Sequence, residues 1–175
     1  MAEAHKAEPK LSDAEKRDRV HELMEHFDTA MLVTRTMDGR MRSRPLAIAD
    51  KRDDGTLYFS TAIESGKVHE VEHDHNVNVV LQDKGRYVSI TGEARIVRDR
   101  ALVDQLWSES WRVWFPGGKD DPSLAIVAVE PAEAWYWDAA GTTGIRYLFS
   151  MAKGYLTGTR PASDGDERHT GHVKM

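Results

Sequence analysis

The chain has 175 residues, with 24 Lys and Arg against 29 Asp and Glu, a formal net charge of -5, and no cysteine. Without cysteine, disulfides, thiol catalysis, iron–sulfur clusters and cysteine-based zinc sites are excluded. The net negative charge argues against non-specific electrostatic binding to nucleic acid or to an anionic membrane. No stretch approaches the ~18 apolar residues of a membrane span, and residues 1–10 lack the apolar segment of a secretory signal. We therefore expect a cytoplasmic protein with no membrane or nucleic-acid partner.

The beginning of the chain predicts one amphipathic helix after a disordered start. Residues 1–10 are charged and rich in alanine, and we expect them to be disordered. Ser12 followed by Glu15 is a capping-box pattern, which is typical of a helix N-terminus. Apolar residues then recur at helical spacing, at Val20, Leu23, Met24 and Phe27. This pattern predicts a helix over residues 13–27.

From residue 30 onward, the pattern predicts short antiparallel strands joined by tight turns. Strands are expected over residues 30–36, 42–49, 57–61, 77–82, 87–97, 124–129 and 133–137. Short helices are expected over residues 65–73 and after Asp99. Pro45 interrupts the second strand, which suits a sheet edge or a bulge. The order predicts a mainly β protein of the α+β class, an antiparallel barrel with flanking helices rather than a βαβ sheet.

The predicted domain covers residues 11–156 and is followed by a tail. The pattern over residues 143–156 is compatible with a C-terminal helix. Beyond it, Gly, Pro, Asp, Arg and His dominate, so residues 157–175 are expected to be disordered.

Residues 57–68 have the features of a phosphate site. A strand ends in the hydroxyls of Ser60 and Thr61, the chain turns, and a short helix begins at Ser65. A helix start offers unpaired N–H groups and the positive end of the helix dipole, and both attract phosphate. Lys67 in the first turn is unfavourable for the helix alone, and an anion there would remove the conflict. The alternative is that Ser65 is an ordinary N-cap and Lys67 a solvated side chain.

A second cationic group consists of Arg42 and Arg44, which share one face of a predicted strand. Two like charges side by side on a half-buried strand are costly unless an anion or a carboxylate answers them. The alternative is an exposed edge with two solvated arginines.

The helix after Ser65 also contains a literal match to the H-E-x-x-H zinc motif. His69 and His73 would share one helix face, and Glu70 would act as the base. The predicted helix is short, and histidines at this spacing more often face solvent, so we expect no metal here. A zinc hydrolase stays as a minor alternative, with Glu93 as its candidate third ligand.

Aromatic residues fall into two contexts in the second half of the chain. Trp135 and Trp137 alternate along one predicted strand, so they share a face and are candidates for the core. Trp114 and Phe115 stand instead in a loop rich in Pro and Gly. We expect this loop to expose both rings, so that a partner or ligand has to cover them. Of the two, Trp114 is the candidate binding residue.

Several of these segments combine into one ordered pattern. The segments are residues 44–46, 58–61, 65–68, 88–94, 114–118, 120–122 and 133–138, together with the helix that carries Trp107. The pattern resembles the pyridoxamine-phosphate-oxidase-like flavoproteins, and more closely their general stress protein branch. The resemblance covers roughly residues 27–138, and the Trp-Phe-Pro-Gly loop is its most specific element.

The resemblance implies an antiparallel split β-barrel that forms a homodimer and binds FMN, or else FAD, in clefts between the protomers. The residues it assigns to the cofactor are Arg44, Pro45 and Leu46 along the flavin ring, Ser60 and Thr61 at the ribityl chain and phosphate, and Ser65 and Lys67 at the phosphate. Trp114 would approach the flavin from its loop, in its own chain or in the partner.

The chain departs from the oxidases proper in two places. Gly66 stands where they carry an arginine before the phosphate lysine, and no Arg-x-His triplet follows Trp137. The resemblance therefore implies a flavin-dependent oxidoreductase with a small-molecule electron donor or acceptor, without identifying either. No side chain stands out as a catalytic acid or base. The alternatives are a flavin-binding stress module without turnover and a split barrel that holds haem or a deazaflavin.

Overall fold

In the computed structural model of the protein, the described residues are 10–139 and 170–175. The helices are α1 (Asp13–Met24), α2 (Gly66–His73) and α3 (Arg100–Leu106), with the short 3₁₀ helices η1 (Glu109–Val113) and η2 (Gly118–Asp120). The strands are β1 (Thr29–Arg35), β2 (Met41–Lys51), β3 (Leu57–Ala62), β4 (Asn76–Asp83), β5 (Arg86–Val97), β6 (Leu124–Asp138) and β7 (Thr170–Lys174). The helix expected over residues 143–156 lies outside the described residues, and so does all but residue 10 of the start over residues 1–10 that is expected to be disordered.

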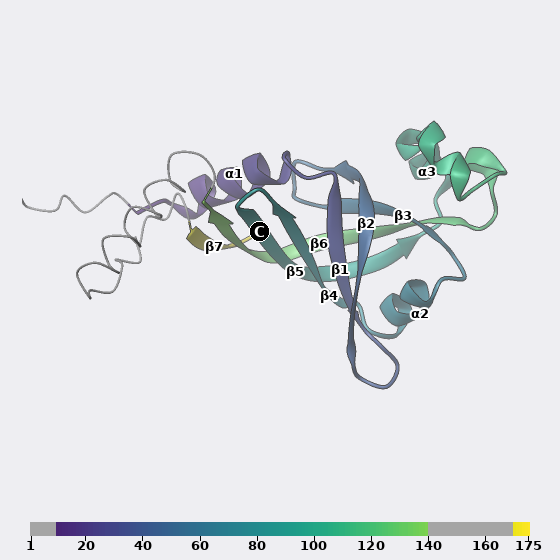
Figure 1. Ribbon diagram of the computed structural model, residues 1–175, viewed down its shortest axis with the longest axis horizontal. Coiled ribbons are helices and arrows are strands. Elements are labelled where there is room, and N and C mark those ends of the chain that lie inside the picture. The colour runs from purple at the N-terminus through teal and green to yellow at the C-terminus, as the bar shows by residue number, and fades with distance from the viewer. Residues whose placement is uncertain (1–9, 140–169) are drawn as a thin grey trace, which may run out of the picture.

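The strands β1 to β6 form a closed antiparallel barrel (Figure 1). Their order is β3-β2-β1-β4-β5-β6, and β3 pairs with β6 to close the ring. The long strands β5 and β6 pair from Arg86↔Asp138 to Val97↔Ile126. The expected antiparallel barrel with flanking helices is confirmed.

Turn residues in the sequence predict where two of the strands turn or reach a sheet edge. In the β4–β5 hairpin, Lys84 and Gly85 both have positive φ, of 42° and 86°. This is the backbone that a two-residue hairpin turn needs, and glycine adopts it without a steric cost. The half of β2 that holds Pro45 pairs with β1, and β3 pairs only with the second half, from Ile48 onward. Pro45 therefore lies on an edge stretch, as expected.

One prediction about the strands is wrong, because residues 124–129 and 133–137 belong to a single strand, β6. Pro131 suggests a break in the sequence, but a register shift between Thr91 and Gly92 on β5 absorbs it as a bulge. A Cβ on Gly92 would lie 2.1 Å from the carbonyl oxygen of Glu130. Glycine at this position therefore lets the two strands approach closely enough to pair across the proline.

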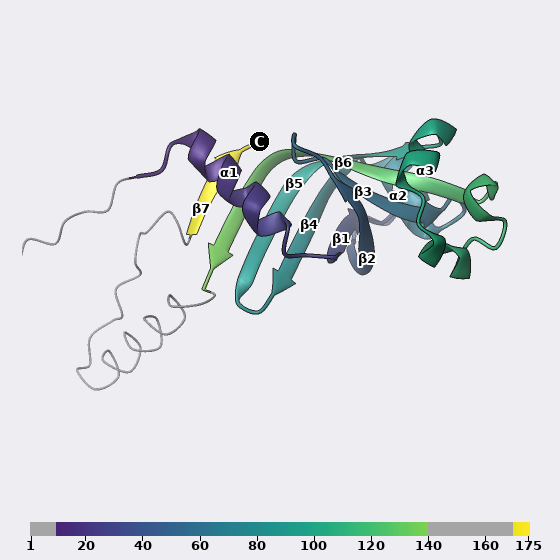
Figure 2. The same cartoon turned by 90° about the horizontal axis from the view of Figure 1, so that it is seen from above.

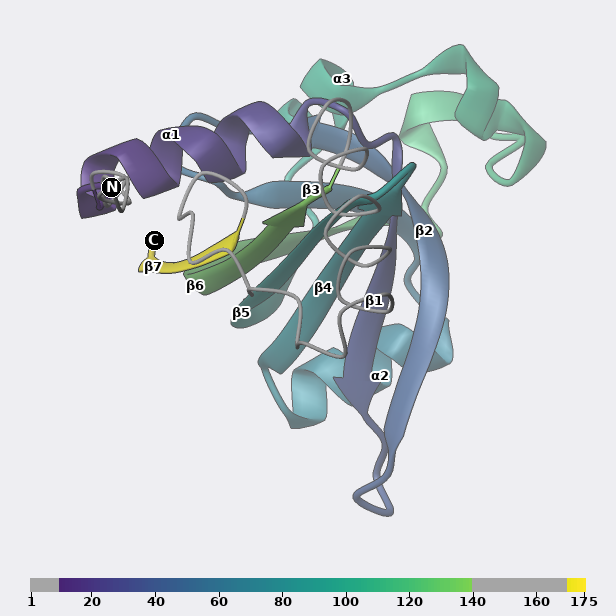
Figure 3. The ribbon, with the colours of Figure 1, turned by 60° about the vertical axis from the view of Figure 1, so that its left-hand side comes forward.

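The capping box of α1 is confirmed. The Ser12 hydroxyl accepts a bond from the Glu15 N–H at 3.3 Å, and the Glu15 carboxylate accepts one from the Ser12 N–H at 2.8 Å. The helix ends at Met24 rather than at residue 27, because the N–H groups of His26 and Phe27 bond three residues back in a tight turn. Figures 2 and 3 show α1 lying over the end of the sheet beside β7. No helix among the described residues is long and apolar enough to cross a membrane.

Two hydrophobic clusters form the interior of the molecule. The larger one fills the barrel and extends to α1, and the smaller one lies under α3 and η1. Phe115 belongs to the smaller cluster and is only 4% exposed, so the expectation that both loop aromatics are exposed is wrong for this residue. The loop folds Phe115 inward onto Leu106 and Ile126, members of the same cluster, whereas Trp114 is 70% exposed.

The prediction that residues 157–175 are disordered is wrong for the last residues of the chain. Residues 170–174 form β7, which extends the sheet beside the C-terminal part of β6, whereas residues 157–169 lie outside the described part of the chain. Val173 is 2% exposed, and Arg17 of α1 donates a bond to the carbonyl of Lys174 at 3.2 Å. A five-residue strand whose partner lies more than thirty residues earlier has no local signal, and so composition alone suggested disorder.

Trp135 and Trp137 share one face of β6, as the alternation predicts, but that face is the outer one. The rings stack with centroids 6.5 Å apart and are 44% and 42% exposed, so their assignment to the core is wrong. His172 of β7 stacks on Trp135 at 4.3 Å and bonds to Glu133 at 2.9 Å. The outer face of β6 and β7 therefore carries a continuous aromatic row.

Candidate functional site

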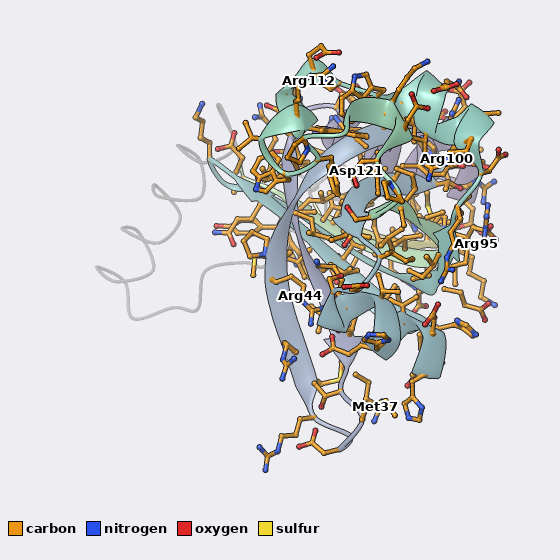
Figure 4. The ribbon with its side chains drawn as sticks, turned by 90° about the vertical axis from the view of Figure 1, so that its right-hand side faces the viewer. Met37, Arg44, Arg95, Arg100, Arg112 and Asp121 are labelled. Carbon is orange, nitrogen blue, oxygen red and sulfur yellow. The ribbon has the colours of Figure 1, made fainter. Side chains whose placement is uncertain are left out.

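The candidate site lies where α2 covers the end of the barrel, against β1 and β5. The chain leaves β3 at Ala62 and enters α2 at Gly66, so the helix start faces the strand end. Val68 and Val71 are buried and fix one face of the helix against the barrel. Figure 4 shows Arg44 on β2 beside this helix. The fold therefore brings the two cationic segments of the sequence together.

Glu70 is the carboxylate that forms ion pairs with both Arg42 and Arg44. It is 4% exposed, and its Oε1 accepts a bond from Nη1 of Arg42 at 2.8 Å. Its Oε2 accepts bonds from Nη2 of Arg44 and, at 2.6 Å, from the hydroxyl of Thr34. Nη1 of Arg44 donates to the same Thr34 hydroxyl at 2.5 Å. Arg42 and Arg44 thus share a face, as predicted, and the interpretation as two merely solvated arginines does not hold.

The electrostatics of Glu70 follow from these contacts. Burial raises the pKa of its carboxyl, but the bonds from Thr34 and Arg44 and the charges of both arginines together lower it by more than burial raises it. The net pKa lies below its ordinary value, so Glu70 stays ionised at neutral pH.

The second half of the site is a group of hydroxyls around Lys67. Its ammonium donates to the Thr61 hydroxyl at 3.1 Å, and that hydroxyl lies 3.1 Å from Oγ of Ser65. Ser65 stands at the N-cap of α2, but its side chain makes no capping bond. The interpretation of Ser65 as an ordinary N-cap is therefore wrong, since its hydroxyl contacts that of Thr61 instead of a backbone N–H of α2.

Lys67 is not a freely solvated side chain either. Burial lowers the pKa of its ammonium, the charge of Arg44 lowers it further, and Glu70 raises it only in part. A half-buried ammonium beside a guanidinium is an unfavourable arrangement that a bound anion would relieve. Together with the first N–H groups of α2, this cluster has the composition of a phosphate-binding site.

Four of the eight predicted cofactor residues come together here, namely Arg44, Thr61, Ser65 and Lys67. The other four lie elsewhere. Ser60 alternates with the buried Thr61 and so faces the opposite side of β3, and Leu46 packs against the main core. Pro45 lies on the outer face of β2, and Trp114 is exposed after η1.

Pro45 lines a hollow of about 440 Å³ on the outer face of the sheet. Its walls are formed by Thr29, Ala30, Met31, Pro45, Val80, Gln82, Asp83 and Lys84. Met31 pairs with Pro45 across β1 and β2 and is 38% exposed, which leaves an apolar floor. Neighbouring residues of a strand point to opposite faces. Arg44 therefore lies in the polar cluster on one face of β2, and Pro45 lies in the hollow on the other face.

Sequence reasoning assigned Glu70 to the zinc motif and missed its role. Its spacing of three from Lys67 on α2 is the signal that could have placed both on one helix face. His69 is 66% exposed on the solvent side, and His73 is exposed as well. Within residues 10–139 and 170–175, no group of three or more His, Asp or Glu could hold a metal ion.

Comparison with known proteins places this architecture. The sequence model of the pyridoxamine 5'-phosphate oxidase-like family matches residues 15–162, which include the whole cluster. The chain belongs to this family. It is 31% identical over 134 residues to general stress protein 26 of Bacillus subtilis, an alignment that covers 74% of this chain and 93% of that protein.

Solved structures of the family agree with the fold. A structure described as a general stress protein 26 from a Jannaschia species is 25% identical, with a TM-score of 0.70 over 93% of this chain and 99% of that one. The general stress FMN/FAD binding protein of Xanthomonas citri is 26% identical, with a TM-score of 0.63 over 73% of this chain and 92% of that one. The barrel is therefore the split barrel of this family.

Proposed function

We propose that this protein binds FMN, with the phosphate at the cluster of Thr61, Ser65 and Lys67, and acts as a flavin-dependent oxidoreductase on a small molecule. The observation that carries the proposal is Lys67, a half-buried ammonium at a helix start, whose pKa is lowered and which donates to the Thr61 hydroxyl beside that of Ser65. The similarity to the general stress FMN/FAD binding protein of Xanthomonas citri supports it.

The residues of the chain would bind and orient the cofactor. Lys67 and Arg44 would supply charge-assisted bonds to phosphate oxygens, which are stronger than bonds between neutral groups. The hydroxyls of Thr61 and Ser65 would donate to the same oxygens, and the first N–H groups of α2 would add the positive end of the helix dipole. Bound flavin would supply the hydride and electron transfer. No described side chain of the cluster is assigned a proton-transfer role.

The ring end would require a second copy of the chain, and we infer a cytoplasmic homodimer. Trp114 is 70% exposed and its neighbour Val113 is 79% exposed, although neither is a polar residue. The aromatic row of Trp135 and Trp137 continues to Tyr87 of β5, which pairs with Trp137 and is 38% exposed. A symmetric dimer would cover both surfaces and give two equivalent sites built from both chains.

The absorption spectrum of the purified protein tests the proposal directly. We expect a yellow protein with the two visible bands of oxidised flavin, and release by heat should yield FMN at one per protomer. A spectrum of haem or of a deazaflavin would replace the cofactor assignment. A colourless protein that also fails to bind added FMN and FAD would refute it.

A second function, flavin binding without turnover, is favoured by one observation. Glu70, the carboxylate of the cluster, has no proton to donate because it stays ionised, and its lowered pKa and its bonds to two arginines and a hydroxyl make it a weak proton acceptor. The two functions differ in their reaction with NADH or NADPH. An oxidoreductase should show bleaching of the flavin by one of these donors and recovery with an added acceptor, whereas a storage module should show neither.

A further inference from the structure

Glu70 joins three elements of the site through its two carboxylate oxygens. It lies on α2, accepts from Thr34 of β1, and accepts from Arg42 and Arg44 of β2. Its partners are the side chains around the candidate phosphate site rather than groups elsewhere in the fold. A buried carboxylate would be expected to weaken an anion site, so its presence here needs a specific reason.

Charge balance gives the first part of that reason. Arg42, Arg44 and Lys67 bring three positive charges, and Glu70 brings one negative charge, so the cluster carries a formal charge of +2. A phosphate monoester carries about -1.5 to -2 at neutral pH. The cluster with Glu70 is therefore matched to one monoester, whereas without it the largely buried Arg44 and the half-buried Lys67 would lie beside the more exposed Arg42 with no carboxylate among them.

The geometry of Arg44 gives the second part. Its side chain is 17% exposed, with Nη1 bonded to Thr34 and Nη2 bonded to Glu70. A guanidinium is planar and has five N–H donors, so fixing both terminal nitrogens sets the direction of the donors that are left. Glu70 and Thr34 also bond to each other, at 2.6 Å, which closes a three-membered network around Arg44.

We propose that Glu70 is the positioning residue of the phosphate site, holding the Arg44 guanidinium beside Lys67 so that the cluster receives one phosphate monoester. This inference rests on the proposed function, since it concerns the same phosphate. The proposal and simple electrostatics predict opposite changes in phosphate affinity when the charge of Glu70 is removed. Removing a negative charge beside an anion should strengthen binding if Glu70 only offsets charge, and should weaken binding if Glu70 holds Arg44 in place.

The test uses Glu70→Gln in the full-length protein, with fluorescence titration of FMN and of riboflavin, which lacks the phosphate. Affinity for FMN should fall about tenfold or more, the usual effect of losing a charged hydrogen bond, and affinity for riboflavin should stay within about twofold. Glu72→Gln is the matched control, because Glu72 lies on the same helix but is 47% exposed and pairs with Arg98. It should change neither affinity.

Thr34→Val provides a second probe that keeps the size of the side chain and the charge of the cluster. It removes the hydroxyl between Arg44 and Glu70, and FMN affinity should fall several-fold while riboflavin affinity is unchanged. Unaltered or tighter FMN binding in either variant would overturn the proposal, and so would an equal loss for both flavins. A wild-type protein that binds neither flavin would instead refute the proposed function.

Discussion

The two faces of β2 present opposite kinds of surface. On the inner face, Arg44 lies in a network in which the charged groups are partnered within one chain. On the outer face, Pro45 lines a hollow together with exposed apolar residues such as Met31. In the proposed flavin site, a protomer would therefore preform the phosphate end, whereas the ring end would lie at apolar surface that a single chain leaves exposed. On this basis we expect phosphate affinity and dimer formation to respond to different substitutions.

The largest effect should come from the inner face. Lys67→Ala removes the ammonium that bonds to Thr61, and FMN affinity should fall about ten- to a hundred-fold. Riboflavin affinity should change little, since it has no phosphate, and titration of both flavins measures the difference. His69→Ala is the control on the solvent side of the same helix and should leave both affinities unchanged. Equal losses for the two flavins in Lys67→Ala would place the phosphate elsewhere.

The next largest effect should come from the outer face of the barrel, where β6 carries the aromatic row. Trp137→Ala removes an exposed ring from the aromatic row, and loss of a central aromatic residue commonly costs an interface about 2 kcal/mol, roughly thirtyfold in dimer affinity. Analytical ultracentrifugation over a dilution series measures the shift. Met37→Ala is the control, because Met37 is 68% exposed but lies at the tip of the β1–β2 hairpin (Figure 4). An unchanged dimer in Trp137→Ala would remove the aromatic row from the interface.

The two faces also differ in how far the sequence predicts them. Local signals are sufficient for the capping box at Ser12, the glycine turns and the shared face of Arg42 and Arg44, because each depends on a few neighbouring residues. The carboxylate partner of Arg44 is Glu70, 26 positions away, and it was hidden in a motif that suggested zinc. The need for a carboxylate or an anion was predictable, but its identity depends on where α2 packs.

The outer face was harder to predict for the same reason. Alternation correctly places Trp135 and Trp137 on one face, but it does not say which face is inside the barrel. That depends on the closure of β3 on β6, a pairing of residues more than sixty positions apart. The strand β7 and the pairing of β6 past Pro131 are likewise set by partners distant in the sequence.

A smaller effect should appear with pH. Burial and Arg44 lower the pKa of Lys67 below its ordinary value of 10.5, so the ammonium loses its proton at a lower pH than a free lysine does. The lysine contribution to phosphate binding is present below that pKa and is lost as the pH rises through it. FMN affinity should therefore decline several-fold on the alkaline side, with riboflavin affinity flat over the same range. In Lys67→Ala, the decline for FMN should disappear, and a decline that persists would assign it to another group.

The last prediction joins the two regions, and it concerns a twofold difference in occupancy. Heterodimers of one Lys67→Ala chain and one Trp114→Ala chain can be isolated with two different affinity tags. If each flavin uses Lys67 of one chain and Trp114 of the other, one site of the heterodimer carries both defects and the other is intact, so half of the sites should bind FMN with wild-type affinity. If Trp114 serves the flavin of its own chain, every site carries one defect and no tight binding returns. Each homodimeric variant is the control, and the second outcome would keep the phosphate site while excluding a site shared between protomers.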